Sequence, residues 1–324
     1  MRPTKVMVVG GAGFIGSHFV DRLLGSLSTE AVCIYDNFTS GREWHFAQHA
    51  DDKRFTVVRG EVADTALLAK SMNGFDTVIH LASNPDIAAA MTNPTIDFIE
   101  GTALTHSVVE AMRLSGCHNL LYASGSGVYG DIGEVEGLED VTPTVPVSTY
   151  GASKLAGEAM VSAYVHMFGL RGFAFRFGNV VGPRQTHGVG FDFLRRLLAD
   201  PTELRILGDG SQSKSYIHVE DVVSAVLGVA EVETAPFRTF NVATLDYITV
   251  TEIAEVTVEL LGIAREDVKF IYSGGDRGWK GDVPIVRLNS ERIRSTGWSN
   301  GRTCREAIRD SLAQMLPDAQ IGRL

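Results

Sequence analysis

The sequence predicts an α/β fold: a doubly wound parallel sheet of the Rossmann type, followed by a smaller mixed α/β lobe at the C-terminal end. Two observations support this prediction. Short β-branched runs alternate with longer stretches of helical spacing over the first part of the chain. A glycine-rich turn joins the first of these runs to the first helical stretch, as in dinucleotide-binding sheets.

The candidate strands are continuous apolar runs, which is how strands read when helices cover both faces of their sheet. Ligands of such sheets bind at the carboxyl ends of the strands, so we expect the chemistry there. In chain order the runs are "KVMVVG" (5–10), "AVCIYD" (31–36), "FTVVRG" (55–60), "DTVIHLA" (76–82) and "NLLYAS" (119–124).

The second part of the chain has loops rich in glycine and proline, "VVGPRQTHGVG" and "SGGDRGWKGDVP", which suggest a second lobe. Between them, "DVVSAVLGVAE" and "TVTEIAEVTVELLG" have helical spacing, and "TFNVAT" resembles one more strand. We predict a dinucleotide-binding domain at 1–180 and a lobe that mainly binds substrate at 181–324. Segments near 216–245 are expected to pack back onto the first domain.

The composition limits the partners of the protein. The 39 acidic and 29 basic residues give a net charge of -10 without any basic run, which argues against nucleic acid or an anionic membrane as a partner. Three scattered cysteines, Cys33, Cys117 and Cys304, fit neither a disulfide framework nor a zinc site. No signal peptide and no apolar stretch of membrane-spanning length is apparent, so we expect a cytoplasmic protein.

The first strand and helix are joined by a dinucleotide fingerprint. Gly10 permits the tight turn, Gly13 lets the backbone approach a pyrophosphate, and Gly16 lets helix and strand pack closely. The free N–H groups at the start of the helix, around Phe14 and Ile15, then face the anion. An accidental glycine-rich turn is the alternative, and the agreement of strand, spacing and helix argues against it.

The second strand ends in Asp36, about twenty residues beyond Gly16, where a carboxylate accepts hydrogen bonds from both adenosine ribose hydroxyls. A 2′-phosphate would be repelled there, which favours NAD over NADP. Arg42 is a nearby cation that would weaken this preference. The alternative interpretation is that Asp36 only forms a turn. The other candidate cofactor contacts follow the strand ends: Asn37, Phe38, Ser40, Gly41, Glu61, Val62, Leu81, Ala82 and Ser83.

Tyr150 and Lys154 lie four residues apart in "YGASK", and the apolar spacing that follows predicts a helix that carries both side chains on one face. A tyrosine that acts as a base at neutral pH must have its phenolate stabilised by roughly 4 kcal/mol, since it normally titrates near 10. One nearby cation supplies about that much. We therefore predict Tyr150 as a proton shuttle and Lys154 as its electrostatic partner.

Six segments occur in this order along the chain: "GGAGFIG", "YDN", "YASGSGVYG", "YGASK", "RFGNVVGP" and "GDGSQSKSYIHVEDV". Together they resemble the extended short-chain dehydrogenase/reductases, and most closely the UDP-glucose 4-epimerases and their nucleotide-sugar relatives. The resemblance implies that Tyr150 is the acid/base, that Lys154 binds the nicotinamide ribose and that Phe177 lies near the nicotinamide. It also implies that Asn179 lies by the sugar diphosphate, that position 214 contacts the nucleotide phosphates, and that the protein is a homodimer.

The sequence departs from the family pattern at the hydroxyl that bonds the sugar 4-oxygen, because that position is Gly125. Ser124 and Ser126 are the candidate substitutes, and we favour Ser126; either is otherwise a loop residue that satisfies its own backbone. Family dehydratases carry an Asp-Glu pair where this chain has Ser126 and Gly127, which favours simple C4 redox chemistry. Gly101 replaces a family asparagine, and the usual arginine-aspartate pair reads Lys214 and Ser215.

An acidic protein that binds a diphosphate needs local cations, and the second lobe offers Lys214 and Arg277, with Asp282 as a ribose partner. The alternative interpretation is that Lys214 and Arg277 are solvated surface charges. Arg184 could face a sugar carboxylate, which suggests a UDP-hexuronic acid, and Val189 is a further candidate substrate contact. His187 and His218 lack partners at metal-ligand spacing, so no metal is expected.

These residues together predict an NAD-dependent nucleotide-sugar 4-epimerase that acts on a UDP-hexose or UDP-hexuronic acid through a transient 4-keto intermediate. Two alternatives stay open at this point. One is an NAD(P)H-dependent reductase of a nucleotide 4-keto sugar, or another nucleotide-sugar oxidoreductase. The other is a dinucleotide sensor that has lost turnover.

Overall fold

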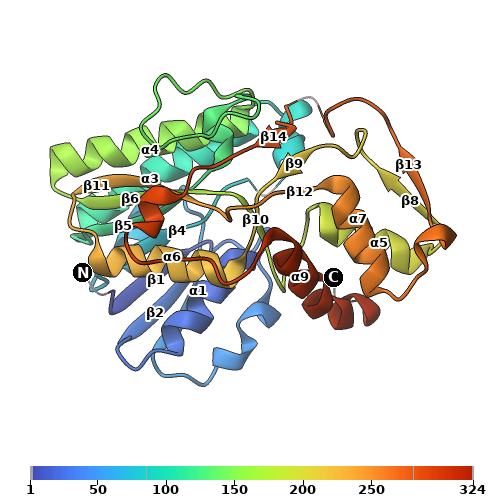
Figure 1. The fold of residues 1–324 in the computed structure, drawn as a ribbon. Helices are drawn as coiled ribbons and strands as arrows, with labels where there is room; N and C mark the ends of the chain where they lie inside the picture. Colours follow the sequence, from blue (N-terminus) through green and yellow to red (C-terminus); the bar gives the residue numbers. More distant parts are fainter. Residues whose placement is uncertain (1–2, 85, 280, 323–324) are drawn as a thin grey trace.

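The computed structural model describes residues 3–84, 86–279 and 281–322, and its centre is a seven-stranded parallel sheet (Figure 1). The order is β11-β6-β5-β4-β1-β2-β3, so the chain changes direction across the sheet between β1 and β4. Crevices at such a point bind ligands in open α/β sheets. The predicted α/β class is confirmed. The strands are β1 (Lys5–Val9), β2 (Ala31–Asp36), β3 (Phe55–Arg59), β4 (Thr77–His80), β5 (Asn119–Gly125), β6 (Arg171–Phe177) and β11 (Phe237–Val242).

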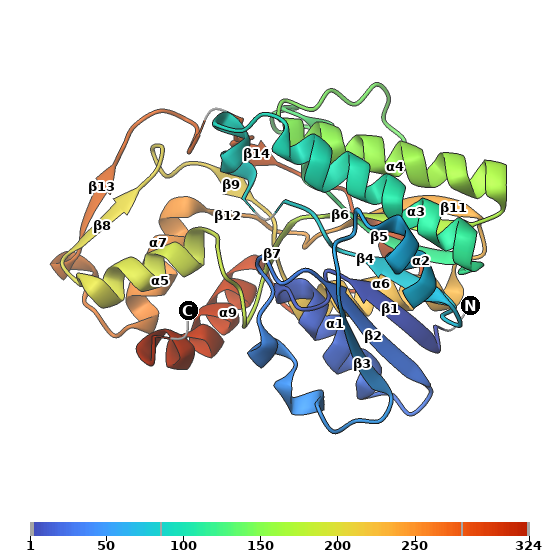
Figure 2. The same cartoon turned by 180° about the vertical axis from the view of Figure 1, so that it is seen from behind.

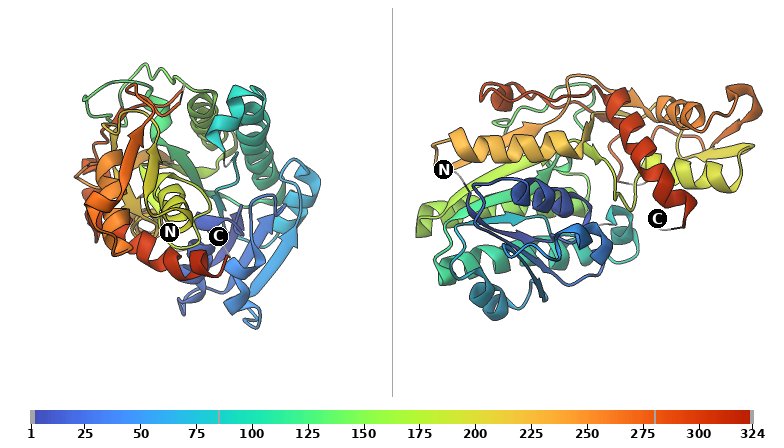
Figure 3. Two further views of the ribbon diagram at one scale, coloured as in Figure 1. Left: turned by 90° about the vertical axis from the view of Figure 1, so that its right-hand side faces the viewer. Right: turned by 90° about the horizontal axis from the view of Figure 1, so that it is seen from below.

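Helices cover both faces of this sheet (Figures 2 and 3). Two separate hydrophobic clusters result, and the apolar strand side chains alternate between them: Val6 and Val8 face one cluster, while Met7 and Val9 face the other. On one face lie α1 (Phe14–Leu24) and α6 (Val219–Val232), and on the other lie α2 (Thr65–Met72), α3 (Leu104–Ser115) and α4 (Thr149–Phe168).

The C-terminal lobe has its own hydrophobic core, in which Phe193, Leu197 and Ile253 are buried. It lies beyond one end of the sheet, at the right of Figure 1. Its elements are α5 (Val189–Ala199), α7 (Val250–Leu260) and α9 (Cys304–Gln320), the parallel pair β8 (Glu203–Ile206) and β13 (Lys269–Tyr272), and the small sheet of β12 (Ile248–Thr249), β9 (Ser213–Lys214) and β14 (Ile285–Val286).

Part of the second half of the chain returns to the sheet. β11 pairs with β6, and α6 packs on α1 through an apolar face that includes Val222 and Val226. β10 (Tyr216–His218) instead pairs with β7 (Asn179–Val181), a short strand that directly follows β6. β7 and β10 therefore join the sheet to the C-terminal lobe.

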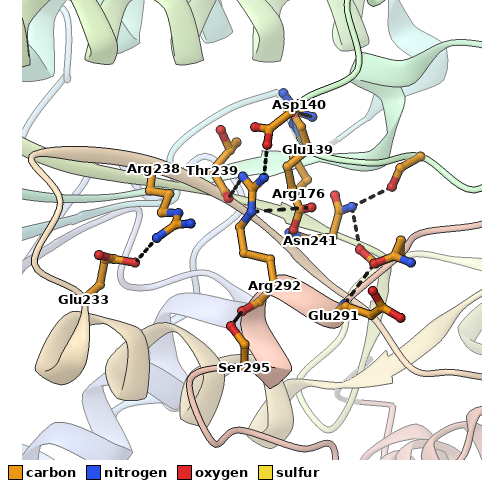
Figure 4. A network of polar contacts seen from close by, with 12 residues as sticks. Glu139, Asp140, Arg176, Glu233, Arg238, Thr239, Asn241, Glu291, Arg292 and Ser295 are labelled. Atoms are coloured by element: carbon orange, nitrogen blue, oxygen red, sulfur yellow. Dashed lines mark hydrogen bonds and ion pairs between the residues drawn. The ribbon is translucent and has the colours of Figure 1, made fainter.

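A polar network fixes the loop that precedes α4 to the edge of the sheet (Figure 4). The backbone N–H of Asn241 donates to Glu139 Oε1 at 2.9 Å, and Arg292, in α8 (Glu291–Arg294), donates to the Thr239 carbonyl at 3.1 Å and to Asp140. These bonds bridge more than fifty residues of sequence in each case. They fix the segment between β5 and α4 to β11 and α8.

Among the described residues, no helix is both long enough and apolar enough to span a membrane.

Candidate active site

A cavity of about 380 Å³ opens at the carboxyl ends of the central strands. Most of the residues predicted from the sequence line it: Gly10, Gly13, Phe14, Ile15, Gly16, Asp36, Asn37, Ser40, Glu61, Val62, Leu81, Ala82, Ser83, Ser124, Tyr150, Lys154 and Phe177. The residues that do not line it are Phe38, Gly41, Ser126, Asn179, Arg184, Val189, Lys214, Arg277 and Asp282.

The glycine-rich turn forms one wall of the cavity. Gly10 has a φ of +83°, and a Cβ there would lie 2.7 Å from the Ala82 nitrogen. A Cβ at Gly16 would lie 2.4 Å from the Gly10 carbonyl oxygen, so both positions require glycine. Gly13 is the N-cap of α1 and offers no side-chain acceptor, which leaves N–H groups at the start of the helix for an anion. This wall fits a pyrophosphate.

Asp36 lies at the end of β2 in the same cavity and is buried. Its Oδ2 accepts a hydrogen bond from the Ala12 N–H at 2.9 Å, and its Oδ1 accepts one from the Phe38 N–H at 2.8 Å. Burial raises the pKa of this carboxyl, while the two N–H donors oppose the rise. The carboxylate keeps free lone pairs for ribose hydroxyls, so the site fits the adenosine end of a dinucleotide.

The predicted helix is α4, and it carries Tyr150 and Lys154 on its cavity side. Ser148 caps it by accepting the Gly151 N–H at 3.1 Å. The Lys154 Nζ donates to the Ala123 carbonyl at 2.9 Å and lies 5.4 Å from the centre of the Tyr150 ring. The two side chains therefore come together as the sequence predicts.

Burial dominates the protonation of both groups. It raises the pKa of Tyr150 to about 12, with a further rise from the charge of Asp97, and a hydrogen bond with the Ser83 side chain opposes the rise. Burial lowers the pKa of Lys154 to about 8, and Asp97 opposes that change. A working phenolate at neutral pH thus needs more positive charge than Lys154 alone provides.

Asp97 is a site residue that the sequence analysis missed. It is only 1% exposed; its Oδ1 accepts a hydrogen bond from Asn84 Nδ2 at 2.9 Å, and its Oδ2 accepts one from Thr149 Oγ1 at 2.6 Å. The second bond ties it to the first residue of α4. No local pattern marks Asp97, because its partners are 13 and 52 residues away in the sequence.

The two serines near Gly125 have different surroundings. The Ser124 hydroxyl donates to Glu158 Oε1 at 2.5 Å, and Glu158 also accepts two hydrogen bonds from Arg176, at 2.9 and 2.7 Å. Ser126 begins the short helix η5 (Ser126–Tyr129) and does not line the cavity. Gly125 is extended, and a Cβ at this position would have no atom within 4 Å.

A π-helical turn, η4 (Phe98–Ala103), lies beside α4 and contributes Ile99 and Glu100 to the cavity. A Cβ at Gly101 would lie 2.6 Å from the Ser153 hydroxyl, so the close packing of this turn on α4 requires glycine there. The other lining residues that the sequence analysis missed are Tyr35, Thr39, Ala63, Asn84, Leu104, Ala123, Thr186 and His187.

The cations predicted for the second lobe have partners within the protein. Lys214 Nζ pairs with Asp282 Oδ1 at 2.6 Å. Arg277 donates to the Asp282 carbonyl at 2.6 Å and pairs with Asp131, which follows η5. Asn179 begins β7 and its N–H donates to the Ser215 carbonyl, while Val189 begins α5. The structure thus brings Lys214, Arg277 and Asp282 together outside the cavity.

Arg184 contacts α1 rather than the cavity. Its backbone has a φ of +65°, and its Nη2 pairs with Asp21 Oδ2 at 2.7 Å. The Arg184 Nη1 is buried and has no hydrogen-bond partner in the described part of the chain, and its role toward a sugar carboxylate stays a prediction. His187 lies on the cavity, and His218 is buried as the N-cap of α6. Within the described ranges, no group of three or more His, Cys, Asp or Glu side chains could hold a metal ion.

Comparisons with known proteins agree with this geometry. The chain is 35% identical over 305 residues to a UDP-glucose 4-epimerase of Mycolicibacterium smegmatis, a match that covers 91% of this chain and 93% of the relative. It superimposes on a crystal structure of UDP-galactose 4-epimerase with a TM-score of 0.83 and 33% identity, over 97% of this chain and 99% of that one. A UDP-glucose 4-epimerase of Thermus thermophilus, solved in complex with NAD, gives a TM-score of 0.83 and 29% identity, over 96% and 98%.

A family model described as the NAD dependent epimerase/dehydratase family matches residues 6–243, which include the glycine-rich turn, Asp36, Tyr150 and Lys154. The resemblance drawn from the sequence, the prediction of an enzyme and the prediction of NAD as its cofactor are confirmed. The chain belongs to the NAD dependent epimerase/dehydratase family.

Proposed function

We propose that the protein is a nucleotide-sugar 4-epimerase that acts on a UDP-hexose or a UDP-hexuronic acid. The observation that carries the proposal is the juxtaposition of Tyr150 and Lys154 with Asp36 and the glycine-rich turn around one cavity. The proton-transfer pair would then act on the sugar 4-oxygen, while a dinucleotide held in the cradle would exchange hydride with the adjoining carbon, C4. The UDP-glucose and UDP-galactose 4-epimerases among its relatives support this choice.

Tyr150 carries the proton chemistry in this mechanism. Its phenolate takes the proton of the sugar 4-hydroxyl as the C4 hydride leaves, and it returns that proton when the hydride comes back to the other face of the resulting 4-keto sugar. Lys154, held by the Ala123 carbonyl, stabilises the phenolate and orients the ribose. When bound, NAD supplies the hydride acceptor and the positive ring charge. No net redox change results.

The substrate diphosphate is proposed to bind at Lys214 and Arg277, which are paired with acidic side chains in this structure. When the diphosphate binds, its oxygens would replace the carboxylates as partners of Lys214 and Arg277, so each cation would stay paired. Asp282, next to both, is the proposed ribose partner, and Asn179 lies on the strand that joins sheet and lobe. This divides the chain into a cofactor part, 1–180, and a part that mainly binds substrate, 181–324.

Among the reactions of this family, dehydration is disfavoured for this chain. Ser126 and Gly127, which occupy the positions of the family acid pair, have no carboxyl group to remove or add a proton at the sugar ring. A 4-keto-sugar reductase remains the rival, since it would use the same Tyr150 and Lys154.

The purified protein should be incubated without added cofactor with UDP-glucose, UDP-glucuronic acid and UDP-N-acetylglucosamine, and the products analysed by chromatography and proton NMR. A C4 epimer without net NADH supports the proposal and identifies the substrate class. Unchanged sugars, together with stoichiometric loss of NADH absorbance when a 4-keto sugar is supplied, contradict it and select the reductase. Binding of NAD without binding of any sugar nucleotide selects the sensor.

The proposal includes a homodimer in the cytoplasm. The neighbouring ends of α3 and α4 expose Leu114, Met167 and Phe168, with Met167 72% exposed, and a second copy would cover them. The three cysteines are buried and unpaired, as in a reducing compartment. Light scattering on the purified protein tests the assembly: twice the chain mass supports it, and a monomer contradicts it.

A further inference from the structure

Ser83 contributes a hydroxyl-bearing side chain to the cavity that Tyr150 also lines. Ser83 follows β4 in the loop that also carries Asn84, and it lines the cavity together with Tyr150, Lys154 and Ser124. Burial raises the pKa of Tyr150, whereas hydrogen bonding with the Ser83 side chain lowers it, which places the two side chains near each other. β4 is adjacent to β5, so Ser83 and Gly125 lie at the ends of neighbouring strands.

The two serines that the sequence analysis favoured are placed less well for this task. Ser124 gives its proton to Glu158, and the Arg176 guanidinium holds both Glu158 oxygens from the other side. All three side chains are buried, so turning Ser124 toward the sugar would leave a carboxylate oxygen without its hydroxyl donor. Ser126 lies one residue beyond Gly125, in η5, and does not line the cavity.

Position 125 contributes no side chain to the reacting centre, and the space that a Cβ would occupy there is empty to 4 Å. A sugar ring can therefore lie closer to β5 at this point than a larger residue would allow. Ser83, which lines the same cavity as Tyr150, is then a candidate to offer a neutral hydroxyl to the 4-oxygen.

We propose that Ser83 is a catalytic hydroxyl that works with Tyr150 at the sugar 4-oxygen, the task for which the sequence suggested Ser126 or Ser124. The inference rests on the proposed 4-epimerase function. The Ser83 O–H donates a hydrogen bond to the Tyr150 oxygen and so stabilises the phenolate before the reaction. While the proton moves between the sugar 4-oxygen and Tyr150, the single Ser83 hydrogen is donated to whichever of these two oxygens carries the negative charge.

The proton balance is simple, because Ser83 keeps its own proton throughout. The proton of the sugar 4-hydroxyl passes to the Tyr150 oxygen as the C4–H bond breaks, and NAD, when bound, would accept the hydride. In the return step the hydride forms the new C4–H bond, and Tyr150 gives its proton back to the 4-oxygen. Ser83 lowers the energy of the charged oxygen in both steps without exchanging a bond.

The test compares Ser83→Ala, Ser83→Thr and Ser124→Ala in the NAD-loaded enzyme. Removing one donor from a reacting oxygen costs about 100-fold in kcat, so we expect that loss in Ser83→Ala, with KM unchanged. Because the Ser83 bond favours the phenolate, the acid limb of the pH–kcat profile should move to higher pH in Ser83→Ala. Ser83→Thr retains the hydroxyl and should restore both the rate and the profile.

The inference is overturned if Ser83→Ala keeps wild-type kcat and an unshifted profile, or if Ser124→Ala alone produces the loss and the shift. Circular dichroism and NAD affinity confirm that each variant is folded and loaded. A wild-type enzyme that converts no UDP-sugar sinks the proposed function, whereas an active wild type with an equally active Ser83→Ala sinks only this inference. A crystal structure of the NAD complex adds a readout free of activity: Ser83 Oγ within hydrogen-bond distance of the Tyr150 hydroxyl supports the inference, and a longer separation contradicts it.

Discussion

At the scale of single residues, burial disfavours the charged forms of Tyr150 and Lys154 that the proposed mechanism uses. Tyr150 is harder to ionise than a free tyrosine and Lys154 is easier to neutralise than a free lysine, because both lose water on burial. With its pKa raised, Tyr150 is a neutral phenol at neutral pH, and positive charge in the cavity would favour its phenolate. This couples proton transfer to cofactor binding.

Tyr150→Phe removes the proton shuttle and leaves the ring in place. We expect kcat to fall by about 10²- to 10⁴-fold, the usual contribution of a general acid–base group, with NAD affinity retained. Turnover by NMR and NAD binding by calorimetry measure the two effects. Tyr164→Phe is the matched control, since Tyr164 lies on the same helix and bonds Glu110 away from the cavity. Substantial turnover in Tyr150→Phe would refute the assignment.

Asp97→Asn removes a buried negative charge that raises the pKa of both Tyr150 and Lys154. Both pKa values should therefore fall, and both limbs of the pH–rate profile should move to lower pH. Asn retains an acceptor for Thr149, so the start of α4 is kept. Asp86→Asn, an exposed neighbour that caps a short helix, should leave the profile in place. A profile that moves to higher pH in Asp97→Asn contradicts this electrostatic account.

At the scale of elements, β5, α4 and β6 form one unit behind the site. Glu158 of α4 and Arg176 of β6 make a two-bond ion pair, and Ser124 at the end of β5 completes it. The pair is 6–7% exposed, so neither charge can return to water if the other is removed. This arrangement fixes the helix that carries Tyr150 relative to the sheet.

Glu158→Ala leaves the Arg176 guanidinium buried without its partner. We expect the free energy of unfolding to fall by about 3–5 kcal/mol, measured by denaturant titration. Glu110→Ala breaks an ion pair with Arg113 that is partly exposed on α3, so its cost should be less than about 1 kcal/mol. Equal losses in the two variants would show that burial does not set the strength of the Glu158 pair.

Long strands and local motifs could be predicted from the sequence, whereas very short strands could not. The five apolar runs of the first part became β1 to β5. In β1, β2, β4 and β5, burial imposes one residue class along most of the strand, whereas β3 lies at the edge of the sheet and is largely exposed. The fingerprint glycines and the Tyr150–Lys154 spacing are local, so they were readable. The two- and three-residue strands β7, β9, β10, β12 and β14 are too short to show any periodicity.

The partners of individual side chains were not readable from the sequence. Ser124 finds Glu158 at a separation of 34 residues, and Arg184 finds Asp21 across the two parts of the molecule. Asp97 is one aspartate among many until the fold buries it beside Tyr150. Such pairings depend on tertiary packing, which is why the serine candidates needed the structure to be ranked.

At the scale of the whole molecule, both parts of the chain line the cavity, since Thr186 and His187 of the second part contribute to it. The segment after η5 reaches the lobe through the Asp131–Arg277 ion pair, and the segment after β7 returns to α1 through Arg184 and Asp21. Two separate contacts thus connect the lobe to the cofactor domain.

Arg277→Ala removes one of the proposed diphosphate contacts, and charge-assisted hydrogen bonds contribute about 1.5–3 kcal/mol each. We expect KM for the nucleotide sugar to rise about 10- to 100-fold with kcat little changed, because Arg277 is remote from the reacting carbon. Arg265→Ala, in the same lobe and stacked on Phe270, is the control and should leave KM unaltered. An unchanged KM in Arg277→Ala would place the diphosphate elsewhere.

The central claim is that the hydride removed from C4 returns to the same sugar within one cavity. The direct measurement is to convert UDP-sugar labelled with deuterium at C4, in ordinary water and without added cofactor, and to follow the label by mass spectrometry and NMR. The account predicts an epimer that keeps its deuterium at C4 with no stoichiometric use of NADH. Loss of the label to solvent, or product formed only when NADH is consumed, would contradict it.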